Sequence, residues 1–110
     1  MEYTIEYYSE AVQDGILSLP DSLAARYIVL TRRIEGVGPN LSPPHTDAFG
    51  DGLFELRLKG HEGIARVFFC VLVGKRVVML HSFIKKSQKT PPREIEIARK
   101  RMKEVKHANP

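Results

Sequence analysis

The sequence predicts one α+β domain in which a strand and two helices precede three antiparallel strands and a final helix. Three observations lead to this fold class: apolar residues at helical spacing before residue 36, apolar or alternating runs between 53 and 84, and a basic amphipathic stretch after Pro91. A chain of 110 residues can build one hydrophobic core but not two, so residues 1–110 are expected to form a single domain. The expected element order is β-α-α-β-β-β-α.

The N-terminal segment predicts a strand followed by a short helix. Tyr3–Tyr8 is rich in residues that favour strands, and Ser9 is a suitable N-cap for a helix from about Glu10 to Ser18.

The segment Leu19–Ser22 interrupts this helix and begins a second one. The next apolar residues follow the i, i+4, i+7 and i+11 spacing of one helical stripe: Leu23, Tyr27, Leu30 and Ile34. Gly36 and Gly38-Pro39 end the second helix. The two helices are therefore expected to form a hairpin that covers one face of a sheet.

Residues 37–52 contain glycines, prolines and an asparagine, which predicts a loop. Three strands are expected after it, at Leu53–Lys59, Ile64–Val73 and Val77–Ile84. The second is the most apolar and is therefore expected in the centre of the sheet. Turns at 60–63 and 74–75 predict an antiparallel meander.

The C-terminal segment predicts a helix that Thr90 caps and in which Pro91 holds the first position. Its expected apolar stripe consists of Ile95, Ala98, Met102 and Val105.

The positive charge of the chain is concentrated at its C-terminal end. From Lys85 onward nine Lys/Arg face three Asp/Glu, whereas residues 1–84 hold eight Lys/Arg and ten Asp/Glu. A localised basic patch is typical of proteins that bind a polyanion, most often nucleic acid, although a solvated helix face would look the same in sequence.

Other features of the composition exclude several classes. No apolar run is long enough to span a bilayer, and the acidic N-terminus does not resemble a secretory signal. The single cysteine, Cys70, lies in an apolar run and is expected to be a buried, inert thiol. A cytoplasmic location fits this cysteine usage.

Strand alternation indicates which side chains share a face. In the first strand of the meander the residues Glu55, Arg57 and Lys59 project together. Arg66 is a lone charge in the central strand, where it either forms an ion pair, for example with Glu55, or projects into a groove. In the third strand one face carries His81, Phe83 and Lys85, and the other carries Leu80, Ser82, Ile84 and Lys86. Adjacency of Arg57, Arg66 and His81 is a hypothesis, because strand register is not readable from the sequence.

If these side chains meet, the groove would combine several cations with an imidazole and an aromatic ring and would contain little acid. Arginine contacts phosphate oxygens in a forked geometry, and Phe83 or Tyr8 would offer a ring for an unstacked base. RNA supplies its own nucleophile, the 2′-OH, so such a site needs only to orient it, remove its proton and neutralise the phosphate. A lysine in the cationic cluster or His81 would serve as the base.

Competing chemistries have weak support in this sequence. It contains no Walker-type or dinucleotide-binding glycine motif, no C-x-x-C, no H-E-x-x-H and no acidic cluster with Mg²⁺ spacing. His45 and Asp47 lie close together in the expected loop, but two potential ligands of this kind occur often by chance. We therefore expect neither a cofactor nor a metal ion.

Residues Gly52 to Glu104 resemble the phage-derived HigB-like branch of the RelE/ParE toxin superfamily. The resemblance rests on F-E-L-R, then R-V-F-F, then L-H-S-F-I-K-K-S-Q-K-T-P, and then a basic final helix. It implies a RelE-like fold: a twisted, mostly antiparallel sheet with an N-terminal helical hairpin and a C-terminal helix. It also implies the toxin of a type II toxin–antitoxin system, a ribosome-dependent endoribonuclease that cuts mRNA by metal-free attack of the 2′-OH and leaves a 2′,3′-cyclic phosphate.

The resemblance also implies roles and partners. Arg57 and Arg66 match the positions of phosphate-stabilising residues, and a basic cluster is matched by Lys85, Lys86 and Lys89. Arg57, Arg66, Lys85 and Lys86 are thus the candidate catalytic residues. To substrate binding we assign Lys59, His81, Phe83 and Lys89. The implied partners are mRNA in the ribosomal A site and a helix-turn-helix antitoxin that forms a hetero-oligomer with the toxin, and no membrane is involved.

Two alternatives remain open. Toxins of this superfamily include proteins that act by binding a protein such as gyrase, since a shared fold does not decide function. A decayed prophage RNA-binding module without activity is the other. Loss of the arginines or lysines would separate the nuclease from the protein-binding toxin, because a nuclease would lose cleavage but retain antitoxin binding.

Overall fold

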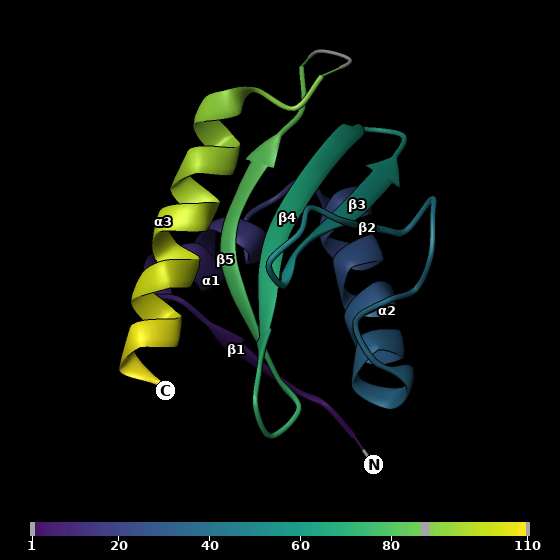
Figure 1. The fold of residues 1–110 in the computed structure, drawn as a ribbon. Coiled ribbons are helices and arrows are strands. Elements are labelled where there is room, and N and C mark those ends of the chain that lie inside the picture. The colour runs from purple at the N-terminus through teal and green to yellow at the C-terminus, as the bar shows by residue number, and fades with distance from the viewer. Residues whose placement is uncertain (1, 87–88, 110) are drawn as a thin grey trace.

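The computed structural model describes residues 2–86 and 89–109, in which a mixed five-stranded sheet lies between two helical layers (Figure 1). The elements are β1 (Thr4–Tyr7), α1 (Glu10–Leu17), α2 (Asp21–Val37), β2 (Thr46–Ala48), β3 (Leu53–Gly60), β4 (Gly63–Leu72), β5 (Arg76–Ile84) and α3 (Pro92–Ala108). Strand order is β1-β5-β4-β3-β2, in which β1 runs parallel to β5 and the other neighbours are antiparallel. The predicted α+β class and the antiparallel meander are confirmed.

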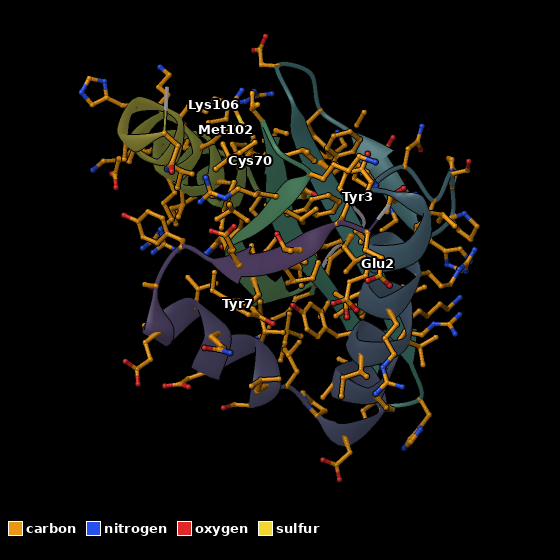
Figure 2. All side chains as sticks on the ribbon, turned by 90° about the horizontal axis from the view of Figure 1, so that it is seen from below. Glu2, Tyr3, Tyr7, Cys70, Met102 and Lys106 are labelled. Atoms are coloured by element: carbon orange, nitrogen blue, oxygen red, sulfur yellow. The ribbon has the colours of Figure 1, made fainter. Side chains whose placement is uncertain are left out.

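The helices α1 and α2 cover one face of the sheet, as predicted for the helical hairpin. Figure 2 shows the sheet between α3 and this pair, with Tyr7 directed towards α1 and α2. The fully buried side chains on this side include Ile16, Leu23, Leu30, Ile34, Leu56, Leu58, Val67 and Phe69. Ser9 caps α1 by accepting a hydrogen bond from the Val12 amide, and the stripe predicted for α2 is buried.

The helix α3 packs along β4 and β5 on the opposite face. Met102 and Cys70 lie together in this second core (Figure 2), and burial raises the pKa of the Cys70 thiol to about 11. The thiol is therefore buried and protonated, as expected. Among the described residues, none of the helices has the length and apolar character that crossing a membrane requires.

Several cations of α3 hold it to the rest of the chain. Arg99 donates to the Phe49 carbonyl, Arg101 to the Leu80 carbonyl and Lys106 to the Asp51 carbonyl, all at 2.7–2.8 Å. Part of the positive charge in the C-terminal segment therefore has a structural role, because it fixes α3 to the rest of the chain. The composition of the segment alone does not reveal this role.

Three details of the prediction were wrong. Residues 37–52 are not entirely loop, because they contain the three-residue strand β2, too short to produce an alternating pattern. The cap of α3 is Pro91 and its first residue is Pro92, while the Thr90 hydroxyl instead donates to Glu55.

The third correction concerns Leu80, which was expected to face away from His81. Phe68 pairs with His81 and Phe69 with Met79, so a β-bulge leaves Leu80 without a partner in register. The extra residue shifts the alternation of β5, and Leu80 joins the core beneath α3.

The start of α2 is fixed to the turn between β3 and β4. The Glu62 carboxylate accepts a hydrogen bond from the Ser22 amide at 2.7 Å, so a residue distant in sequence caps the helix. This bond lowers the pKa of the Glu62 carboxyl below its ordinary value. Gly60 lies against the same serine, and a Cβ there would stand 2.6 Å from Ser22 Oγ. This packing sets the position of the first turns of α2 beside the ends of β3 and β4.

Two glycine-to-alanine substitutions are expected to have opposite effects on the free energy of unfolding. Gly60→Ala should lower it by about 1–3 kcal/mol, because the new methyl group overlaps Ser22. Gly36→Ala should raise it by up to about 1 kcal/mol, since Gly36 lies in α2 with nothing within 4 Å of an added Cβ. Urea denaturation of both variants measures the pair. Equal effects would contradict the close packing of Gly60.

Candidate functional site

The sheet face that α3 covers only in part holds the predicted residues in three rows across β3, β4 and β5. The first row consists of Glu55, Phe68 and His81, and the second of Arg57, Arg66 and Phe83. In the third row Lys59 pairs with Ile64. The carbonyl of Ile64 accepts a hydrogen bond from the Lys85 amide. Successive rows lie two residues apart along the strands, about 7 Å. Ser87 and Gln88 of the motif that follows lie outside the described residues.

The predicted adjacency of Arg57 and Arg66 is confirmed, because the two residues are direct partners in the β3–β4 register. Like charges placed opposite one another are unfavourable, and here Glu55 offsets the repulsion. Its Oε1 accepts a hydrogen bond from Arg57 Nε at 3.2 Å and lies 3.4 Å from Arg66 Nε. One carboxylate therefore holds both guanidinium groups in place.

The expectation of little acid holds for the cavity described below, because no Asp or Glu is among the described residues of its lining, but two carboxylates lie beside it on the sheet face. Glu55 is 1% exposed and also accepts the Thr90 hydroxyl at 3.2 Å. Asp47, its register partner in β2, accepts a hydrogen bond from Arg57 Nη2 at 3.0 Å. Arg57 thus bridges two carboxylates that face each other on neighbouring strands. Strand alternation predicted the position of Glu55 on this face. The position of Asp47 was not predicted, because it depends on strand β2, which the sequence did not indicate.

Arg66 satisfies both alternatives posed for it, an ion pair with Glu55 and a side chain that borders a cavity. The residue is 9% exposed, and its Nε has no hydrogen-bond partner among the described residues. Burial lowers the pKa of the Arg66 guanidinium, while the Glu55 charge acts in the opposite direction. A guanidinium remains charged in proteins despite such a shift. Because Arg66 borders the cavity, its positive charge favours an anionic group there.

The cavity beside Arg66 has a volume of about 310 Å³. Four segments line it: α2, the loop before β2, β3 and β4. The lining residues are Arg26, Pro44, His45, Arg57, Lys59, Ile64 and Arg66. Three arginines, a lysine and a histidine thus border one space, and no Asp or Glu is among the described residues of its lining. This composition suits an anionic group such as a phosphate.

Sequence reasoning did not identify Arg26 and His45 as members of the site. Arg26 is one turn beyond the Ser22–Glu62 contact, which holds that part of α2 beside β3 and β4. His45 is held to β3 because its carbonyl accepts the Arg57 amide at 2.8 Å. Both placements depend on tertiary contacts between distant segments, so no local pattern could have indicated them.

His81 is not brought into the cavity of the arginines. Its Nε2 lies 2.6 Å from Glu94 Oε1 of α3, and its ring borders a separate, smaller cavity together with Ser9 and Arg101. Phe83 separates the two regions: it pairs with Arg66 in register and stacks at 6.0 Å on the His81 ring. The hypothesis that the three residues are adjacent is therefore right for the arginines and wrong for His81.

The predicted lysines lie at different depths. Lys59 borders the cavity, Lys85 is half-buried at the end of β5, and Lys86 and Lys89 are exposed in the segment that leads to α3. Tyr8, the other ring considered for stacking, is not among the residues that line the cavity.

Tyr8 donates a hydrogen bond from its hydroxyl to Glu104, and Arg101 lies over its ring.

Across residues 2–86 and 89–109, no three or more His, Cys, Asp or Glu side chains are grouped in a way that would hold a metal ion.

Comparison with known proteins gives one family. A search of curated proteins returned no significant match. The sequence model of the family described as phage derived protein Gp49-like (DUF891) matches residues 14–103, which include every residue that lines the cavity. This range is well over half of the chain. The chain belongs to the phage-derived Gp49-like family, a toxin-like family of the RelE/HigB type.

Proposed function

We propose that this protein is the HigB-like toxin of a type II toxin–antitoxin pair and that it cleaves mRNA on the ribosome. Membership of a toxin-like, phage-derived family supports the first part. One observation carries the nuclease part: the buried Arg66 guanidinium stands beside Arg57 and borders a cavity lined by cations.

In this proposal the scissile phosphate occupies the cavity. Arg66 donates to its non-bridging oxygens, and Arg57, oriented by Glu55 and Asp47, adds a second guanidinium. Attack by the 2′-OH increases the negative charge on those oxygens, so fixed donors stabilise the transition state more than the ground state. Lys59 adds positive charge at the same cavity.

The remaining predicted residues bind the RNA on either side of that phosphate. Phe83 offers a half-buried ring next to Arg66 for base stacking. Lys85, Lys86 and Lys89 contact the backbone along the segment after β5, and His81 with Glu94 forms the far edge of the binding face.

Two partners complete the proposal. The mRNA is presented in the ribosomal A site, and a helix-turn-helix antitoxin neutralises the toxin in a hetero-oligomer. Family resemblance supports both partners, and the chemistry assigned to the cavity requires no cofactor.

The experiment that tests this function is induced expression in a bacterial host with mapping of mRNA 5′ ends. Cells with the unsubstituted protein should arrest and show new 5′ ends at fixed positions relative to the reading frame of translated messages. The double variant Arg66→Ala/Lys86→Ala should show neither, while it still copurifies with the antitoxin.

Other outcomes would identify a different function. Growth arrest without new 5′ ends would reject the nuclease and favour a toxin that binds a protein such as gyrase. Absence of both arrest and cleavage would favour an inactive prophage relic.

A further inference from the structure

Attack by a 2′-OH requires a group that accepts its proton, and the lining of the cavity offers few candidates. Arg26, Arg57 and Arg66 remain protonated in proteins and cannot act as acceptors. An ammonium such as Lys59 has donors only, and proline and isoleucine side chains are inert. Among the described residues that line the cavity, His45 is thus the one whose side chain, an imidazole, ordinarily serves as a proton acceptor in proteins.

The nearby carboxylates are engaged elsewhere. Glu55 is buried and contacts Arg57, Arg66 and the Thr90 hydroxyl at once. Asp47 accepts from Arg57. These carboxylates orient the arginines, and neither belongs to the cavity lining.

The backbone of His45 fixes its position at the edge of β3. Its amide donates to the Ser42 carbonyl at 3.0 Å, and its carbonyl accepts the Arg57 amide at 2.8 Å. The half-buried ring forms no hydrogen bond or ion pair with another side chain that the structure describes. The anchored residue therefore presents an unoccupied imidazole beside the phosphate-binding arginines.

We propose that His45 is the general base of the cleavage reaction, an inference that rests on the proposed ribonuclease function. An imidazole nitrogen takes the proton of the 2′-OH as the 2′ oxygen forms a bond to phosphorus. The bond between phosphorus and the 5′ oxygen breaks, its electron pair stays on that oxygen, and a solvent proton completes the 5′-OH. The imidazolium then returns its proton to solvent, and the other product is a 2′,3′-cyclic phosphate.

The test is single-turnover cleavage of mRNA on programmed ribosomes by purified variants. His45→Ala is expected to lower the cleavage rate by about 10²–10⁴-fold, the contribution typical of a positioned base. Binding to programmed ribosomes and thermal unfolding should change little. Added imidazole should restore part of the activity of His45→Ala, since free imidazole can enter the vacated space and accept the proton. His45→Gln, which keeps hydrogen bonding but not basicity, should remain slow.

A matched control is His61→Ala, because His61 is an exposed histidine in the turn between β3 and β4 and does not line the cavity. It should cleave at nearly the unsubstituted rate. Unchanged cleavage by His45→Ala would overturn the assignment and leave the nuclease intact. Loss of activity that glutamine restores, or that imidazole fails to restore, would equally overturn a role as base. If the unsubstituted protein does not cleave, the proposed function and this inference fall together.

Discussion

Replacement of Arg66 by alanine is expected to lower the single-turnover rate of mRNA cleavage by about 10²–10³-fold, the effect typical of removing one transition-state donor. The physical reason is that Arg66 is buried beside the cavity, where its guanidinium places positive charge next to the phosphate. Arg66→Lys should recover only part of the rate, since an ammonium keeps the charge but loses the forked geometry.

Arg76 provides the control for this prediction. It also pairs with a glutamate, Glu6, but it stands opposite Leu72 at the other end of β4. Arg76→Ala should therefore leave cleavage within about threefold of the unsubstituted rate per folded molecule, since it touches neither the cavity nor its arginines. Equal loss in both variants would show that a general loss of stability, and not phosphate binding, explains the effect.

The second large effect is expected for stability. Glu55→Ala should lower the free energy of unfolding by about 3–5 kcal/mol, because it leaves the Arg66 guanidinium buried without its counter-charge. It also releases Arg57 and the Thr90 hydroxyl. Cleavage should fall as well, since the arginines lose the group that orients them. Denaturant unfolding measures the change.

Glu6→Ala is the matched variant, because Glu6 also pairs with an arginine but remains partly exposed. Its loss should cost less than about 1 kcal/mol. The hydrogen bond from Arg76 lowers the pKa of Glu6 in the folded state. Its small contribution is therefore present above the unfolded-state pKa and disappears as the pH falls through the lower folded-state value. A similar cost for both glutamates would contradict the special role of the buried one.

The elements of this fold could be predicted because each long segment carries its own periodicity. Alternation in β3 placed Glu55 and Arg57 on one face, and the stripe of α2 identified its buried side. The alternation of β5 failed at Leu80, where a bulge that no residue type signals adds one residue.

The site could be predicted only in part, since it depends on contacts between distant segments. The pairing of Arg57 with Arg66 required the register of two strands, which a turn sequence does not specify fully. Arg26 and His45 reach the same cavity from a helix and a loop, and only the folded chain brings them there. The charge excess of α3 overstated the free basic surface, because Arg99, Arg101 and Lys106 bond to backbone carbonyls.

The most direct test of the proposed chemistry uses purified protein and ribosomes programmed with an mRNA that carries one 2′-deoxynucleotide at the mapped cleavage position. The all-ribose message should be cut to fragments with a 2′,3′-cyclic phosphate and a 5′-OH, and the same mRNA without ribosomes should stay largely intact. The 2′-deoxy message should resist cleavage at that position although it binds equally well. Cleavage of the 2′-deoxy message at the same bond, or fragments that end in a 5′-phosphate, would contradict attack by the 2′-OH and with it the mechanism assigned to Arg57 and Arg66.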